Sequence, residues 1–207
     1  MDLREQLTLI KRITALADTG LVYSQDDYDQ GRYQELKEIS LQLLSLVSDA
    51  PLKSWQEFLM PVKDYPTPKV DIRGFVLNNK RQILMAKESA DGKWAIPGGW
   101  ADIGFTPSEM VVRELEEETG VKCKVQRLLA IYDKKCHPHP PQPFYIYKIV
   151  FLCKMESGEL RHGFDMEGAA FFDVNQLPEL SEDRILDSQI KQLFRLAVQK
   201  HPEVYFD

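Results

Sequence analysis

Carboxylates are concentrated in one short stretch of the chain, which carries four glutamates among the five residues 114–118. In a helix, with about 100° between successive residues, Glu117 and Glu118 lie about 60° and 40° to either side of Glu114. Glu116 points away from these three and is expected to be solvated. Two carboxylates about 5 Å apart repel each other by roughly 3 kcal/mol at an effective dielectric constant of about 20. A face of three glutamates therefore predicts a site for a hard divalent cation such as Mg²⁺ or Mn²⁺, which also bridges to phosphates.

The residues around the glutamates mark the two ends of a helix. A capping-box pattern begins at Thr106, and Gly120 is a typical stop after the last turn. Together they predict a helix over residues 107–119. A charged helix face is usually only solvated, but the one basic residue within this helix is Arg113, which cannot neutralise three carboxylates. The charge pattern therefore favours a metal site.

The spacing of these residues resembles the signature of the Nudix hydrolase family, GX5EX7REUXEEXGU, in which U is a bulky aliphatic residue. Eight of the nine specified positions match: Gly99, Arg113, Glu114, Leu115, Glu117, Glu118, Gly120 and Val121. The resemblance implies an α/β fold, a Nudix α/β/α sandwich with a mixed sheet. It also implies that Glu114, Glu117 and Glu118 bind Mg²⁺ or Mn²⁺. The Gly98 carbonyl would join them, and Arg113 would hold the glutamates in place.

The ninth position of the signature, normally glutamate, is Phe105 in this chain. In the family that glutamate supports the helix and its arginine, so Asp102 is a candidate to replace it as the partner of Arg113. Phe105 could instead pack on an apolar neighbour. A further acid in the family comes from a later strand, where this chain has Glu167; an exposed turn residue is its alternative role. The catalytic set that the resemblance implies is Arg113, Glu114, Glu117, Glu118 and Glu167.

Basic residues outside the signature are candidates for contacts with a substrate. Arg73 lies on the first expected strand and Lys87 follows the second, so either could bind phosphate or be an ordinary surface base. His137 and His139 lie in a proline-rich loop beside two lysines, and they could contact a substrate or have no such role. Aromatic residues that could stack on a base, or belong to the core, are Tyr132, Phe144 and Tyr147.

The resemblance implies a hydrolase that splits the pyrophosphate of a nucleoside diphosphate linked to a group X. A helical region before a Nudix domain resembles a bacterial branch of ADP-ribose pyrophosphatases, some of which act on CDP-choline. We therefore expect cleavage of CDP-choline to CMP and phosphocholine, with ADP-ribose as the alternative substrate. RNA 3'-end trimming and a non-catalytic nucleotide-binding module are further alternatives. The net charge of −6 disfavours broad capture of nucleic acid, and the retained glutamates disfavour a loss of catalysis.

The chain divides by pattern into a helical N-terminal domain with a linker, residues 1–66, and the Nudix domain, residues 67–207. Two helices bury little apolar surface alone, so their stripes should pack on the rest of the chain or on a second copy, and a homodimer is expected. The stripes are Leu3, Leu7, Ile10 and Ala17 and, after a break near Gly20, Leu36, Ile39, Leu43 and Leu46. Strands are expected over residues 70–77, 82–86, 121–131, 144–153 and 169–174, and a last helix over 183–199.

Composition also bounds the compartment. The first residues do not combine a basic segment with an apolar one, and no apolar run approaches the roughly 18 residues that a membrane span needs. The three cysteines are an odd number at wide spacing, which favours reduced thiols over a disulfide framework. We expect a cytoplasmic protein that does not contact a membrane.

Overall fold

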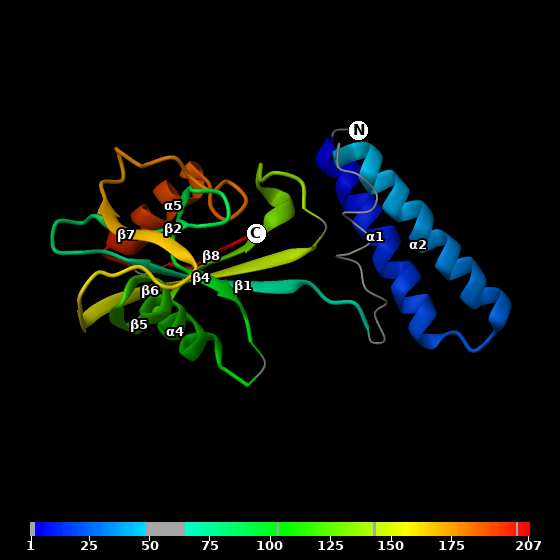
Figure 1. Ribbon diagram of the computed structural model, residues 1–207, viewed down its shortest axis with the longest axis horizontal. Coiled ribbons are helices and arrows are strands. Elements are labelled where there is room, and N and C mark those ends of the chain that lie inside the picture. The colour runs from blue at the N-terminus through cyan, green and yellow to red at the C-terminus, as the bar shows by residue number, and fades with distance from the viewer. Residues whose placement is uncertain (1–2, 49–64, 103, 143, 202) are drawn as a thin grey trace. The chain divides into compact units, whose positions relative to one another are not determined.

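Figure 1 shows the computed structural model, which describes residues 3–48, 65–102, 104–142, 144–201 and 203–207. The chain separates into two compact units. The first comprises Met1–Pro68 and Pro141–Tyr145, and the second comprises Lys69–Pro140 and Ile146–Asp207. The sequence pattern assigned residues 141–145 to the second part of the chain instead. The linker expected before residue 67 lies partly outside the described residues.

The first unit is a hairpin of two helices, α1 (Leu3–Tyr23) and α2 (Asp27–Ser48). The turn follows residue 23 and not Gly20, because the Asp26 carboxylate accepts the backbone N–H groups of Tyr28 and Asp29 and so caps the start of α2. An ion pair lies buried between the helices, with Lys37 Nζ 2.6 Å from Asp18 Oδ1. Leu7, Ile10, Leu41 and Leu44 form the small apolar core. Within the described residues, neither this hairpin nor any other helix is long and apolar enough to cross a membrane.

The outer face of α2 carries the apolar stripe that the sequence predicts. Its members are exposed, by 37% for Leu36, 43% for Ile39, 37% for Leu43 and 76% for Leu46. The side of α2 that packs on α1 instead contains Lys37, Ser40, Leu41 and Leu44. The helix therefore has a second apolar stripe inside the hairpin, and the predicted stripe stays available for the expected packing on a second copy.

The second unit contains two sheets and two long helices (Figure 1). The larger sheet has the order β4-β1-β6-β5-β8 and is mixed, because β1 pairs in parallel with β6 but antiparallel with β4. The smaller sheet has the order β3-β2-β7 and is antiparallel. The elements are β1 (Lys69–Val76), β2 (Ile83–Glu88), β3 (Trp94–Ala95), β4 (Gly98–Trp100), α4 (Pro107–Thr119), β5 (Val121–Asp133), η1 (Lys134–Cys136), β6 (Ile146–Gly158), β7 (Met166–Phe172), α5 (Asp187–Val198) and β8 (Tyr205–Phe206).

Helices α4 and α5 cover opposite faces of the larger sheet, as Figure 1 shows. Alternation along β1 explains this arrangement, since Ile72 and Val76 enter the cluster with Leu115 of α4, whereas Phe75 enters the cluster with Leu193 of α5. Gly74 allows α4 to approach the sheet, because a Cβ at this position would lie 2.8 Å from the Leu115 side chain. The α/β/α sandwich with a mixed sheet is confirmed.

Local signals located most of these elements. The expected helix over residues 107–119 coincides with α4, whose N-cap is Thr106 and whose C-cap, Gly120, has a φ of 73°. The five expected strands correspond to β1, β2, β5, β6 and β7, and the last helix begins four residues later than expected, at Asp187. Strands β3, β4 and β8 were not predicted, because segments of two or three residues have no periodicity.

The packing of α5 predicts the cost of a cavity at Leu193, which is fully buried. We expect Leu193→Ala to lower the free energy of unfolding of this unit by about 3 kcal/mol, since transfer and cavity terms add. Urea denaturation followed by circular dichroism measures the change. The control is Lys191→Ala, which removes only an exposed ion pair with Asp187 and should cost less than about 0.5 kcal/mol. Equal losses in the two variants would contradict this account of the core.

Candidate active site

Glu118 lies at the inner side of α4 and is only 6% exposed. Its Oε2 accepts the backbone N–H of Gly98 at 3.0 Å, which ties the last turn of the helix to β4. Burial raises the pKa of Glu118 to about 8; Arg73 and the Gly98 N–H oppose this shift, and Glu88 and Glu114 add to it. Glu118 is therefore a carboxylate whose negative charge is incompletely balanced by the protein.

Glu114 lies one turn earlier on the same side of α4 and is half-buried. A Cβ on Gly99 would come within 2.9 Å of Glu114 Oε1, so glycine at this position leaves room for the carboxylate. Burial raises the pKa of Glu114, and Glu117 and Asp165 add to the shift, against the opposing effects of Arg73 and Arg113. Two glutamates of the predicted trio, Glu114 and Glu118, therefore meet beside Gly98 and Gly99.

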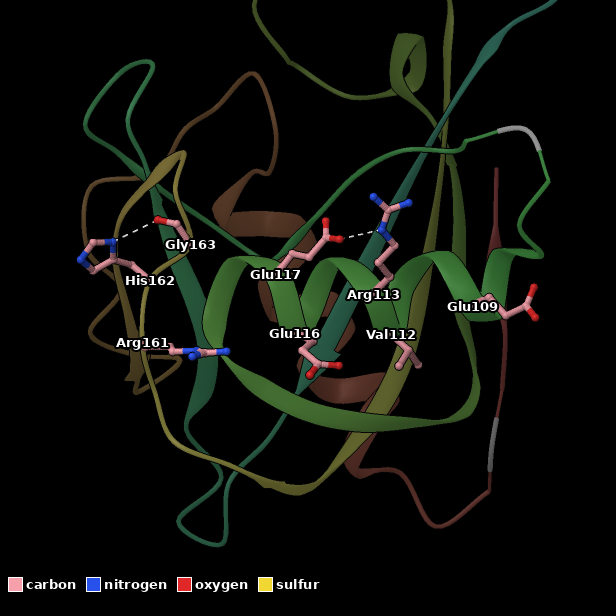
Figure 2. A pocket seen from close by; sticks show the side chains of 8 residues that line it. All are labelled: Glu109, Val112, Arg113, Glu116, Glu117, Arg161, His162 and Gly163. Atoms are coloured by element: carbon pink, nitrogen blue, oxygen red, sulfur yellow. Dashed lines mark hydrogen bonds and ion pairs between the residues drawn. The ribbon is translucent and has the colours of Figure 1, made fainter.

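Glu117 is directed towards Arg113, as Figure 2 shows. Its Oε1 accepts from Arg113 Nε at 2.7 Å, and both side chains are exposed. Arg113 also has the partner proposed from the sequence, with Nη1 3.6 Å from Asp102 Oδ2. The guanidinium lies 5.1 Å from the centre of the Phe105 ring, so Phe105 packs on the cation of Arg113.

Arg73 lies beneath these carboxylates and is only 6% exposed. Its guanidinium donates to Asp71 Oδ1 at 2.8 Å and to the Ile96 carbonyl at 3.1 Å, and it lies 3.9 Å from Glu88. Arg73 is therefore not a surface base, and its contact with a substrate phosphate stays a prediction. Its charge opposes the rise in the pKa values of Glu114 and Glu118.

Further charges extend this buried network across three strands and the segment before α5. Lys148 on β6 donates to Asp71 Oδ2 at 2.6 Å and to the Arg184 carbonyl. The Arg184 guanidinium then lies 2.8 Å from Glu88 Oε1. Sequence reasoning missed the network. A signal was nevertheless present, because Asp71 and Arg73 stand at alternate positions that share the face of buried Phe75.

The carboxylates near Gly98 and Gly99 fit a divalent cation. Burial and like charge raise the pKa of both Glu114 and Glu118, so a cation that binds the ionised forms would supply the missing positive charge. In the described part of the chain, no three acidic, imidazole or thiol side chains form a ready metal-binding group in this conformation. Glu117 is paired with Arg113 here, so a site with all three glutamates requires that side chain to turn.

Glu167 and Lys87, two expected site residues, bind each other. Their side chains form an ion pair of 2.7 Å, and both are partly exposed. Glu167 is the extra residue of a β-bulge, because Glu88 pairs with Met166 whereas Lys87 pairs with Gly168. The structure thus pairs the predicted acid and the predicted phosphate ligand with each other.

Asp165 is an acid that the sequence reasoning missed. Its charge acts on both Glu114 and Glu88 and raises their pKa values. Its backbone carbonyl accepts from Ser89 Oγ at 2.6 Å, which holds it beside the end of β2. The only sequence signal was its position, two residues before Glu167.

His137 and His139 are engaged within the protein. His137 Nε2 lies 3.0 Å from Asp207 Oδ2, and His139 Nδ1 donates to the Glu182 carbonyl at 2.6 Å. Burial lowers the pKa of His139 to about 3, so its ring is neutral. The substrate contacts of the two histidines stay a prediction. Tyr132 is fully buried, which removes it as a stacking residue, whereas Tyr147 is 41% exposed.

A groove runs along the outer side of α4, between the helix and the loop that connects β6 to β7 (Figure 2). Its volume is about 770 Å³, and Glu117 lies on its edge. The lining residues are Glu109, Val112, Arg113, Glu116, Glu117, Arg161, His162 and Gly163. Glu117 therefore lies between this groove and the carboxylates near Gly98.

The α/β/α sandwich and the position of Glu114 and Glu118 beside Gly98 and Gly99 define the class of protein. A family model for the NUDIX domain matches residues 67–194, and a second model, described as a UDP-X-like N-terminal oligomerisation domain, matches residues 4–59. The chain belongs to the Nudix hydrolase family, and it is an enzyme of that family.

Two similar proteins match nearly all of the chain, and a third matches 68% of it. YjhB of Bacillus subtilis, provisionally named an ADP-ribose pyrophosphatase, is 40% identical over 193 residues, which are 93% of this chain and 91% of YjhB. A crystal structure of a UDP-X diphosphatase is 34% identical with a TM-score of 0.64, and the match covers 100% of both chains. An ADP-ribose pyrophosphatase structure from Streptococcus suis is 31% identical with a TM-score of 0.62, covering 68% of this chain and all of that one.

The raised pKa of Glu118 predicts a pH-dependent stability in the absence of divalent cations. Its ordinary pKa is 4.5 and its value in the folded protein is about 8, so the folded state binds more protons than the unfolded state between these limits. The free energy of unfolding should therefore fall as the pH rises from about 5 to about 8. Urea denaturation in EDTA measures this fall.

Glu118→Gln should make the fall smaller, because glutamine does not titrate. Glu116→Gln is the matched control, since Glu116 lies on the same helix and pairs with Lys122 at the surface. In Glu116→Gln, the free energy of unfolding should fall with pH as much as it does in the wild-type protein. A fall of the same size in all three proteins would contradict the assignment to Glu118.

Proposed function

We propose that this protein hydrolyses the pyrophosphate of a nucleoside diphosphate linked to a group X, giving a nucleoside monophosphate and phosphorylated X. The observation that supports this most strongly is the pair Glu114 and Glu118. Both carboxylates face Gly98 and Gly99 with incompletely balanced charge. Such a pair stabilises a divalent cation together with the phosphate groups that the cation binds.

Each residue of the site has a distinct part in this proposal. Glu114, Glu117 and Glu118 would hold Mg²⁺ or Mn²⁺, with the Gly98 carbonyl as a further oxygen ligand. Arg113, which pairs with Glu117 here, would keep Asp102 as a partner, 3.6 Å away. When bound, the ion lowers the pKa of a coordinated water and neutralises charge on phosphoryl oxygens.

Asp165 is the residue that we assign to accept the proton of the attacking water. It is exposed and acts electrostatically on Glu114, whereas Glu167, the acid expected from the sequence, is already paired with Lys87. A carboxylate within hydrogen-bond reach of a water is a competent general base. Single substitutions of Asp165 and Glu167 can therefore show which of the two carboxylates is the general base.

The relatives that cover nearly the whole chain bear names of two substrate classes. The UDP-X diphosphatase supports a pyrimidine nucleotide, which is also the class of CDP-choline, the substrate expected from the sequence. YjhB supports ADP-ribose. UDP-linked groups, CDP-choline and ADP-ribose are therefore the candidates, and short RNA tests the alternative of 3'-end trimming.

The cation site predicts the effect of exchanging its glutamates. In Mg²⁺ or Mn²⁺, the wild-type protein should hydrolyse at least one of UDP-glucose, CDP-choline and ADP-ribose. Glu117→Gln and Glu118→Gln should each lower kcat at least about 100-fold, and isothermal titration should show weaker Mn²⁺ binding. Glu116→Gln is the matched control and should stay within about twofold of wild type. Undiminished turnover in both site variants would rule out the cation site.

The same assay distinguishes the two candidate acids. Asp165→Asn should lower kcat strongly, by about 100-fold, with Mn²⁺ binding less affected. Glu167→Gln should lower it by less than about tenfold, since it removes an exposed ion pair. The reverse order of the two effects would restore the assignment to Glu167.

The N-terminal hairpin supports a second proposal, that two copies of the chain form a homodimer through it. The exposed stripe of α2 continues onto α1, because Leu16 and Tyr23 line the same groove as Tyr33 and Leu36. Contiguous apolar surface of this kind marks an interaction site. The family model that matches this region is described as an oligomerisation domain, which favours a second copy as the occupant.

Charge in the stripe should dissociate this dimer. Light scattering of the wild-type protein should give twice the chain mass of 23.9 kDa. Leu43→Asp should weaken the dimer at least about 100-fold, because two copies of the aspartate would be buried. Gln34→Asp, an exposed position of α2 outside the stripe, is the control and should remain dimeric. A monomeric wild-type protein, or a dimeric Leu43→Asp variant with unchanged affinity, would contradict the proposed interface.

A further inference from the structure

Phe164 is the most exposed large apolar side chain among the described residues, with a relative accessibility of 108%. It lies in the loop over residues 159–165, which connects β6 to β7. A single exposed phenylalanine needs no functional explanation by itself. This one follows Gly163 and precedes Asp165, and both of these neighbours are fixed against the candidate active site.

The loop is attached to the end of α4 on one side of Phe164. The backbone N–H of Arg161 donates to the Thr119 carbonyl at 3.0 Å, and that of Gly163 donates to the Glu118 carbonyl at 3.1 Å. Gly163 packs so closely that a Cβ there would lie 2.3 Å from the Glu117 carbonyl oxygen. Figure 2 shows Gly163 and His162 beside the helix turn that carries Glu117. The loop backbone therefore rests on the cation-binding helix itself.

The loop is attached to β2 on the other side of Phe164. The Asp165 carbonyl accepts from Ser89 Oγ at 2.6 Å and from Ser89 N–H at 3.3 Å. The Asp165 charge also raises the pKa of Glu114. Phe164 is thus held between two fixed neighbours at the edge of the site, with its ring directed into solvent.

We propose that Phe164 is a specificity-determining residue whose ring stacks on the base of the bound nucleotide. This inference rests on the proposed hydrolysis of nucleoside diphosphate derivatives. A base has a planar, weakly hydrated face, and stacking it on the ring removes apolar surface of both partners from water. Because the loop backbone next to the ring is hydrogen-bonded to the helix turn that carries Glu118, a nucleotide with its phosphates at the carboxylates can extend its base towards this loop.

The test compares binding of nucleotides with binding of a ligand that lacks a base. In Mg²⁺, Phe164→Ala should raise the Kd of UMP, CMP or AMP about tenfold, a change of about 1.4 kcal/mol. Inhibition by inorganic pyrophosphate should stay unchanged. With the preferred substrate, KM should rise by a similar factor while kcat stays within about threefold. Phe164→Trp should bind nucleotides as wild type does and change its fluorescence when they bind.

Phe206→Ala is the matched control, because Phe206 is another highly exposed phenylalanine and lies on β8, at the opposite edge of the larger sheet from β4. It should leave nucleotide binding unchanged. The assignment is overturned if Phe164→Ala binds nucleotides as wild type does, weakens pyrophosphate equally, or changes only the oligomeric state. Failure of the wild-type protein to hydrolyse any nucleotide would overturn the proposed function instead, and nucleotide binding would still decide the role of Phe164.

Discussion

The structure depends on carboxylates that are buried with too little positive charge to balance them. Glu118 is bound to the Gly98 N–H, and Arg73 lies beneath it, yet burial still raises its pKa to about 8. Burying a carboxylate is costly unless another group compensates its charge. The protein accepts this cost at one place only along α4, where Gly98 and Gly99 bring the backbone close. A divalent cation is the group that best resolves this imbalance.

The fold creates this situation through two separate contacts. Apolar packing of Leu115 on the sheet fixes the rotation of α4, so that Glu114 and Glu118 must face β4. Strand β1 places Arg73 below them, and Asp71 and Lys148 fix the guanidinium in turn. Removing a single member leaves another buried charge without its partner, so the residues of the network depend on one another.

The sequence predicted what local rules determine. The caps at Thr106 and Gly120 gave both ends of α4, and the spacing of the glutamates identified the cation site as a hypothesis. The pairing of Glu167 was not predictable in this way, because its partner Lys87 comes from another strand. Arg73 alternates with Asp71 along β1, but its contacts with Ile96 and Glu88 come from outside this strand. Asp165 was missed for the same reason, because its charge acts on Glu114 only in the folded chain. In α2, two apolar stripes were compatible with the same periodicity.

The way the β6–β7 loop is attached has a consequence for how such enzymes diversify. Backbone groups of Arg161, Gly163 and Asp165 make the attachments, so the loop keeps its course whatever side chain stands at residue 164. In the proposed role of Phe164, a single substitution there would alter which nucleotide is preferred while the carboxylates of α4 stay in place. The preference for a base and the residues of hydrolysis would then change independently in evolution. Similar proteins do carry the names of different substrates.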